Sequence, residues 1–147
     1  MTLATSRLPA RPSSREDILD AAEAQFARHG FEGASMRAIA EAAGVAQALL
    51  HYHFKTKEGL FEAMFARRSG AINRIRLARL DAMLVRGNPT VEDIVEALLR
   101  PTVEAGHDPG QGGGRFASLI LAVSTAEGDR QKDLVARSYD AMAGRFI

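Results

Sequence analysis

Two short helical segments joined by a glycine constrain the fold of this chain more than any other feature. Residues 35–43 read SMRAIAEAA and residues 46–53 read AQALLHYH, with Gly44 and Val45 between them. Glycine readily adopts the left-handed conformation that ends a helix, and Ser35 is of a type that caps the start of one. Because helices this short are unstable alone, other helices must hold them in place. The pattern therefore predicts a helix-turn-helix unit within a larger helical fold.

The second of these segments has an apolar side and a polar side. Leu50 and Phe54 are four residues apart, so they share one side of a helix and are expected to pack on Ile39 and Phe26. The side chains that point away from the core are expected to be those of Gln47, Ala48, His51 and Tyr52. The helix is thus predicted to be held from behind by apolar contacts while a polar surface faces outward.

This polar surface has groups that fit a nucleic acid. A short rigid helix enters a major groove about 12 Å wide, and the small Ala46 and Ala48 allow close approach to base edges. Gln47 can form paired hydrogen bonds with adenine. His51, Tyr52 and Lys57 can reach phosphate oxygens, beside the anion-binding amides at the start of the next helix.

The remainder of the chain indicates helices and no strands. Apolar residues nowhere alternate with period two over the length of a strand, and Ala, Leu, Arg and Glu dominate the 147 residues. The fold class is therefore predicted to be all-α. Further helices are expected at 13–29, 57–84, 91–105, 115–126 and from 129 onward, with a loop at 106–114. Thr56 and Thr90 are the expected caps, Gly30 ends the first helix, and Gly70 bends or splits the helix that begins at 57.

Composition excludes several kinds of protein and site. The chain has no cysteine, which excludes disulfides and cysteine zinc sites and favours a cytoplasmic setting. It has no run of about 18 apolar residues that could span a membrane, and its first residues lack the apolar region of a signal peptide. Residues 1–12 are predicted to be a flexible basic arm, because prolines oppose helix there and arginines add charge.

Neither catalysis nor metal binding has a supporting motif. His51 and His53 lie two positions apart, about 200° around a helix, and cannot easily share an ion. The glycine-rich GQGGG lacks the strand and the Lys-Ser/Thr pair of a phosphate-binding loop. We therefore expect no enzyme activity, no catalytic residue, no metal site and no cofactor. A solvated helix face is expected for the arginines at positions 67, 68, 74, 76 and 79.

Residues 13–61 resemble the DNA-binding domain of the TetR-type (tetracycline repressor-like) transcriptional regulators. The resemblance rests on residue types at many fixed spacings: Ile18, Ala21, Ala22, Phe26, Gly30, Phe31, Ser35, Arg37, Ile39, Ala40, Ala43, Gly44, Val45, Tyr52, His53, Phe54, Lys57, Glu58 and Leu60. It implies a three-helix DNA-binding head at 13–60, followed by a helical ligand-binding and dimerisation domain at 61–147.

The resemblance also implies DNA contacts at several positions of this sequence. The start of the family's second helix, which contacts phosphates and sometimes a base, is matched by Ser35, Met36 and Arg37. The base-reading start of its third helix is matched by Ala46, Gln47 and Ala48. Its phosphate-gripping positions are matched by His51, Tyr52, His53 and Lys57. The family more often has Ser, Lys and Gly or Thr at 46–48, so the resemblance does not transfer an operator sequence.

The helices after Leu60 resemble the family's regulatory half, in which the fourth to seventh helices enclose a small molecule. Candidate lining residues, chosen by type although ordinary core packing is the simpler explanation for each, are Phe65, Met83, Leu98, Phe116 and Leu119. Family members usually continue into two more long helices that pair between subunits, whereas this chain ends within the seventh and is expected to be truncated. The resemblance implies a ligand-responsive repressor that binds a palindromic operator as a homodimer. The alternatives are a truncated relative with weak or no operator binding, and a helical small-molecule-binding module without DNA function.

Overall fold

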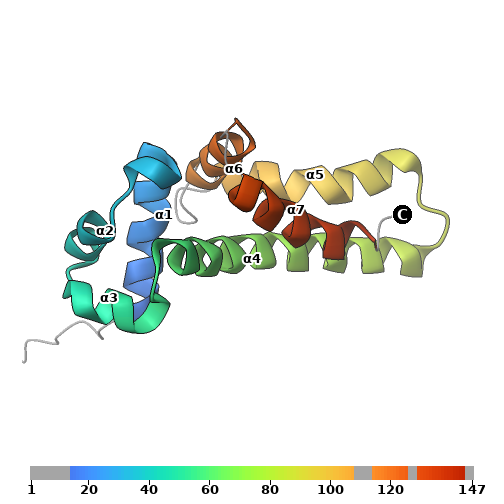
Figure 1. The fold of residues 1–147 in the computed structure, drawn as a ribbon. Coiled ribbons are helices and arrows are strands. Elements are labelled where there is room, and N and C mark those ends of the chain that lie inside the picture. The colour runs from blue at the N-terminus through green and yellow to red at the C-terminus, as the bar shows by residue number, and fades with distance from the viewer. Residues whose placement is uncertain (1–13, 108–113, 126–128, 145–147) are drawn as a thin grey trace, which may run out of the picture.

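The computed structural model describes residues 14–107, 114–125 and 129–144, and within these ranges every regular element is an α-helix (Figure 1). In chain order the helices are α1 (Ser14–Gly33), α2 (Met36–Ala43), α3 (Gln47–Phe54), α4 (Lys57–Arg86), α5 (Val91–His107), α6 (Arg115–Thr125) and α7 (Asp129–Ala143). The predicted all-α class is confirmed. The predicted arm at 1–12 lies outside the described residues, as does most of the predicted loop at 106–114.

The helices form a head at one end of a long arm (Figure 1). The head consists of α1, α2 and α3, and α4 leads away from it for 30 residues. The fifth helix returns along α4 toward the head, α6 packs on α1, and α7 then runs away from the head beside α4. This arrangement leaves α3 at the outer end of the head, with α4 connecting it to the remaining helices.

The helix boundaries follow from the caps that the sequence predicts. The hydroxyl of Ser35 accepts a hydrogen bond from the amide of Ala38, which begins α2, and Gly44 ends α2 with φ of 67°. The hydroxyl of Thr56 likewise accepts from the amide of Gly59 at the start of α4. At the start of α5, Thr90 and Asp93 bond each other's backbone amides reciprocally. The predictions for Ser35, Thr56 and Thr90 are therefore confirmed.

Two glycine positions differ from expectation, and a proline lies within the predicted fifth helix. Gly30 has φ of 69° and ψ of 176°, which interrupts α1, but helical turns resume as far as Gly33. Gly70 does not split α4, which continues through it as one helix from Lys57 to Arg86. Pro101 lies inside α5, where its missing N–H removes one hydrogen bond of the helix.

A single buried cluster extends from the head into α4 and α6. It includes a chain of aromatic contacts in which ring centroids are separated by 5.1 Å (Phe26–Phe61), 6.1 Å (Phe61–Phe65) and 5.5 Å (Phe65–Phe116). The cluster therefore crosses the predicted boundary between residues 60 and 61 without a break. Because apolar burial is the main stabilising contribution to folding, the head and the start of the arm stabilise each other.

The expected solvated arginine face on α4 is wrong for four of its five members. One of them is Arg79, which is half-buried and donates to Glu104 of α5 at 2.7 Å. Arg67 and Arg68 extend to acidic residues of α1, and Arg76 is only 4% exposed. The guanidinium of Arg76 donates to the carbonyl of Leu98 at 2.8 Å and to the hydroxyl of Thr102 at 2.5 Å. Both acceptors lie beside Pro101, so Arg76 supplies donors where α5 is interrupted. These arginines connect helices rather than solubilising one.

Candidate nucleic-acid interface

The rear side of α3 is buried as predicted. Leu50 is 0% exposed and Phe54 is 7% exposed, and both belong to the buried cluster that contains Phe26 and Ile39. Fully burying a leucine or phenylalanine side chain contributes about 1.5–3 kcal/mol relative to leaving it in water. The burial of these two residues therefore fixes which side of α3 faces outward.

The outward side of α3 presents the residues that the sequence places there. Ala46, Gln47, Ala48 and His51 are exposed, and Tyr52 is 76% exposed. His53 is half-buried beside them, with its ring 5.3 Å from that of Tyr52. At the start of α2, Ser35 and Arg37 are exposed, whereas Met36 is half-buried against the core. The predicted DNA-contacting residues of α2 and α3 are thus exposed, apart from the half-buried Met36 and His53.

Lys57 has internal partners that the sequence does not reveal. Its ammonium donates to the carbonyl of Ala34 at 3.2 Å and lies 3.5 Å from that of Glu32. It also lies 4.5 Å above the ring of Phe31, a favourable cation–π distance. In this structure the side chain ties the start of α4 to the segment between α1 and α2. A phosphate contact by Lys57 stays a prediction.

His51 contacts both a base-reading residue and the turn after α3. Its Nδ1 lies 3.2 Å from the carbonyl oxygen of Lys55, and its Nε2 lies 3.4 Å from Nε2 of Gln47. The amide of Lys55 donates in turn to the carbonyl of His51 at 2.9 Å. Lys55 has φ of 62°, an uncommon conformation for a residue other than glycine. His51 thus contributes two of the hydrogen bonds that hold this unusual turn.

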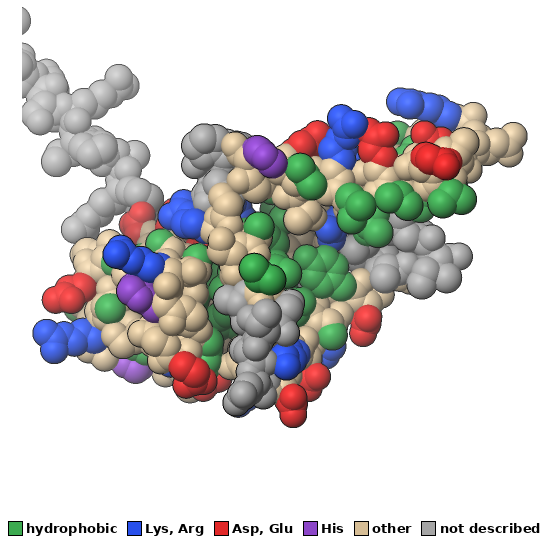
Figure 2. Space-filling model, turned by 90° about the horizontal axis from the view of Figure 1, so that it is seen from above, with side chains coloured by type: hydrophobic (Ala, Val, Ile, Leu, Met, Phe, Trp, Pro, Cys, Tyr) green, Lys and Arg blue, Asp and Glu red, His purple; other side chains and the backbone are tan. Residues whose placement is uncertain are grey.

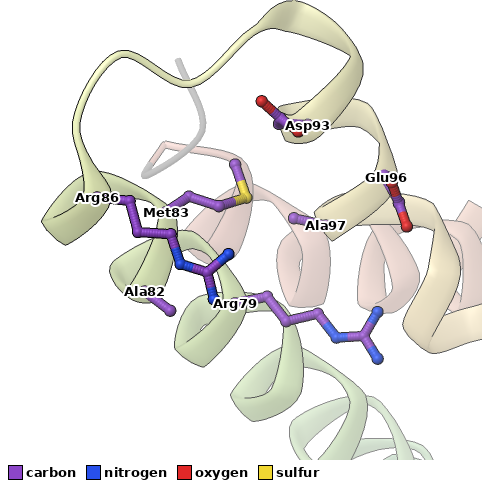
Figure 3. A pocket seen from close by; sticks show the side chains of 7 residues that line it. All are labelled: Arg79, Ala82, Met83, Arg86, Asp93, Glu96 and Ala97. Atoms are coloured by element: carbon purple, nitrogen blue, oxygen red, sulfur yellow. The ribbon is translucent and has the colours of Figure 1, made fainter.

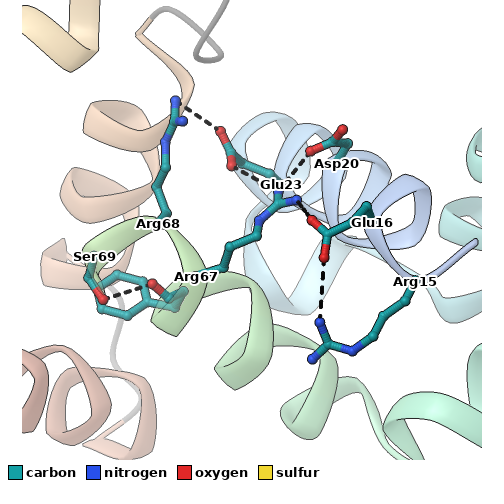
Figure 4. Close-up of polar contacts among 8 residues, drawn as sticks. Arg15, Glu16, Asp20, Glu23, Arg67, Arg68 and Ser69 are labelled. Carbon is teal, nitrogen blue, oxygen red and sulfur yellow. Dashed lines mark hydrogen bonds and ion pairs between the residues drawn. The ribbon is translucent and has the colours of Figure 1, made fainter. Parts of the chain in front are cut away.

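The head is connected to the arm by an ionic network between α1 and α4 (Figure 4). Arg67 donates to Glu16 and to Asp20, at 2.8 Å each. Glu23, which is buried, lies 3.7 Å from Arg67 and 3.6 Å from Arg68. Burial alone would lower the pKa of Arg67, but its hydrogen bonds to the two carboxylates raise it on balance. Arg67 therefore stays charged, and the two arginines together hold α1 against α4.

The ligand candidates do not come together at one site. Phe65, Phe116 and Leu119 belong to the buried cluster, and Leu98 is half-buried on α5. Met83 instead lines an open cavity of about 230 Å³ between α4 and α5 (Figure 3), together with Arg79, Ala82, Arg86, Asp93, Glu96 and Ala97. A second cavity of about 220 Å³ nearer the head is lined by Arg68, Ala71, Ile72, Ile75, Pro101, Glu104 and Ala105. Sequence reasoning missed this second set, because residue type does not show which side chains of two helices meet.

Apolar side chains form an exposed row on α5. Its members are spaced four residues apart and are Val91, Val95, Leu99 and Val103. Figure 2 shows apolar side chains gathered along the arm that α4 and α5 form. Within the described ranges, no group of three His, Cys, Asp or Glu side chains is placed to hold a metal ion, and no helix is both long and apolar enough to cross a membrane.

The pair α2 and α3, joined by a tight turn and with one side of α3 buried and the other exposed, is typical of helix-turn-helix proteins. Comparisons with known proteins indicate which family of these the head resembles. Residues 18–64 match the family model described as bacterial regulatory proteins, tetR family. The chain is 42% identical over 64 residues to the HTH-type transcriptional repressor AcnR of Corynebacterium efficiens, covering 44% of this chain and 33% of AcnR. It is 33% identical over 125 residues to the HTH-type transcriptional regulator UidR of Escherichia coli, covering 84% of this chain and 56% of UidR.

The fold extends this similarity beyond the head. The structure matches that of the fatty acid degradation regulator FadR from Bacillus halodurans with a TM-score of 0.69 at 19% identity, covering 90% of this chain and 64% of FadR. At this identity the match shows the fold alone. The chain spans about a third of AcnR and about half of UidR. The N-terminal helix-turn-helix head, residues 18–64, is thus a domain of the TetR family of bacterial regulatory proteins, and the relatives named above are transcriptional regulators.

Proposed function

We propose that this chain is a sequence-specific DNA-binding transcriptional regulator of the cytoplasm, acting as a ligand-responsive repressor. The observation that carries the proposal is the orientation of α3, with Leu50 and Phe54 buried and Gln47, His51 and Tyr52 in water. A helix held in this way can enter a major groove without unfolding any of the core. The repressor assignment is supported by the similarity to AcnR.

The roles of the individual residues follow from their chemistry and position. Gln47 lies in the first turn of α3 and reads a base edge, and the neighbouring Ala46 and Ala48 are small enough to let the backbone approach. Tyr52 and Arg37 are exposed and contact phosphates, as does the hydroxyl of Ser35. The phosphate contacts set the orientation of the head on the duplex, and Gln47 then distinguishes one sequence from another.

DNA binding is tested by titrating the full chain against the region upstream of its own gene at several salt concentrations. Gln47→Ala combined with Tyr52→Ala is expected to weaken specific binding, with the lost base contact accounting for about 1–3 kcal/mol. The control, Val85→Ala, changes an exposed residue near the end of α4 that is far from the head, and leaves affinity unchanged. If the Gln47 and Tyr52 pair of substitutions leaves binding unaltered at every salt concentration, the proposed reading surface is wrong.

The proposal includes binding to a palindromic operator as a homodimer. Two heads related by a two-fold axis would enter successive major grooves on one side of the duplex, about 34 Å apart. The exposed row on α5 offers apolar surface of the kind that subunit contacts bury. Sedimentation of the chain with and without operator DNA tests this part. A monomer at micromolar concentration, with weak salt-sensitive binding, would instead support the alternative of a regulator that binds only through single heads.

The ligand response is proposed from the two cavities between α4 and α5 and from the network that connects α4 to the head. A ligand shifts an equilibrium only if it binds one arrangement of the helices better than another. The expected result is a small molecule that raises the melting temperature of the chain and lowers its affinity for DNA. A molecule that stabilises the chain when the chain has no affinity for any DNA would instead favour a helical small-molecule-binding module.

A further inference from the structure

We propose that His51 is a positioning residue that fixes the side-chain amide of Gln47 for base reading, rather than a phosphate contact. The inference rests on the proposed function, because it concerns how the exposed side of α3 recognises DNA. It goes beyond that function by assigning to His51 a role that the family resemblance does not imply. The geometry of three residues carries it: Gln47, His51 and Lys55.

The imidazole of His51 is anchored at one nitrogen. Nδ1 lies 3.2 Å from the backbone carbonyl oxygen of Lys55. A carbonyl oxygen can only accept a hydrogen bond, so Nδ1 carries the proton and donates it. The same turn is held from the other side, since the amide of Lys55 donates to the carbonyl of His51 at 2.9 Å. The ring is therefore fixed at the end of α3 in one tautomer.

The second ring nitrogen of His51 determines how the amide of Gln47 is turned. With Nδ1 protonated, Nε2 of the neutral ring carries a lone pair and accepts a hydrogen bond. The nearest donor is Nε2 of Gln47 at 3.4 Å, one helical turn earlier on the same side of α3. This contact uses one of the two hydrogens of the amide nitrogen. The amide oxygen and the second hydrogen remain free, and they match the donor and acceptor of an adenine edge.

The same contacts leave His51 without a group for a phosphate. A phosphate oxygen accepts hydrogen bonds, so it requires a free N–H from the ring. The only N–H of the neutral ring is directed at Lys55, and the other nitrogen is occupied by Gln47. The family resemblance implies a phosphate contact at this position, whereas the hydrogen bonds of this chain make His51 a partner of the base-reading residue.

Fixing the amide before DNA arrives strengthens discrimination between bases. A side chain that is already ordered loses less conformational freedom on binding, and the saving for one such side chain corresponds to about three- to tenfold in affinity. The saving applies only to the base that matches the fixed orientation. Loss of His51 is therefore expected to relax base preference at one position and to leave the number of phosphate contacts unchanged.

The test uses DNA selected from a random library by the unaltered full-length chain, with each base pair of the selected site then replaced in turn. Gln47→Ala first identifies the base pair that Gln47 reads. His51→Asn is the informative variant, because its amide retains a donor for the carbonyl of Lys55 but offers no acceptor at the position of Nε2. We expect His51→Asn to reduce preference at that base pair about three- to tenfold, with an unchanged dependence of affinity on salt.

Two results would overturn the role of His51. One is full base preference in His51→Asn together with a salt dependence reduced by about one phosphate contact, which is the signature of a lost phosphate partner. The other is a nitrogen NMR spectrum of the free chain that shows the proton of His51 on Nε2. Tyr52→Phe serves as the comparison, since loss of its hydroxyl should weaken all sequences equally. If Gln47→Ala changes no base preference, the proposed function fails at its own test, whatever the tautomer of His51.

Discussion

The two sides of α3 should respond oppositely to truncation, and Leu50→Ala and Tyr52→Ala form the matched pair that shows it. Leu50 is 0% exposed and Tyr52 is 76% exposed, although they are only two residues apart. Replacing a buried leucine by alanine removes its transfer free energy and leaves a cavity, which together cost about 2–5 kcal/mol. Truncating an exposed side chain away from caps and networks changes stability by about 0.5 kcal/mol or less.

These free energies convert into separable melting temperatures. For a chain of this size, each kcal/mol shifts the midpoint by about 2–4 °C, so Leu50→Ala should melt roughly 4–20 °C lower and Tyr52→Ala within about 2 °C of the unaltered chain. Thermal unfolding followed by far-ultraviolet circular dichroism measures both. In DNA titrations below either midpoint, Tyr52→Ala should be the more impaired of the two. Equal melting temperatures for the two variants, or a lower one for Tyr52→Ala, would refute the orientation of α3.

Three further changes test other parts of the structure. Gly44→Ala should destabilise the chain by about 1–2 kcal/mol because φ is 67° there, and Gly44→Asn by less, as urea unfolding can measure. Arg67→Gln should lower stability by about 1 kcal/mol or less, and the difference should shrink in high salt, whereas no salt-dependent difference is expected for the exposed Arg74→Gln. Hydrogen bonds from the backbone and hydroxyl of Thr90 lower the pKa of Asp93 below its ordinary range. Its stabilising contribution is therefore complete above about pH 4 and is lost as the pH falls through the lowered pKa, so the gap in melting temperature between the unaltered chain and Asp93→Asn should close in acid.

The elements that the sequence predicts correctly are those with local causes. Ser35, Thr56 and Thr90 cap helices through contacts within three residues, and Gly44 ends α2 through its own backbone conformation. The two sides of α3 also follow from spacing along one helix. Each of these predictions needs only neighbouring residues, and spacing along the chain contains that information.

The features that the sequence does not predict depend on residues far apart in the chain. Arg67 meets Glu16 across more than fifty positions, and no periodicity along α4 shows that α1 supplies its partners. Arg76 is buried and bonds to Leu98 and Thr102 of α5, a meeting of two helices that the spacing within either one does not reveal. Lys57 is an exposed cation by type, yet its ammonium meets the carbonyls that end α1. In all three cases a long side chain found its partner only through the tertiary fold.

The unbroken length of α4 has a mechanical consequence. Thirty residues at 1.5 Å each make a rod about 45 Å long, and the helix passes through Gly70 without a hinge. A rotation of about 5° around its middle would displace each end by about 2 Å, comparable to the difference between a formed and a broken hydrogen bond. A small change in how α5 packs against the far half of α4 would therefore displace α3 and alter the position of its exposed side chains relative to a bound molecule.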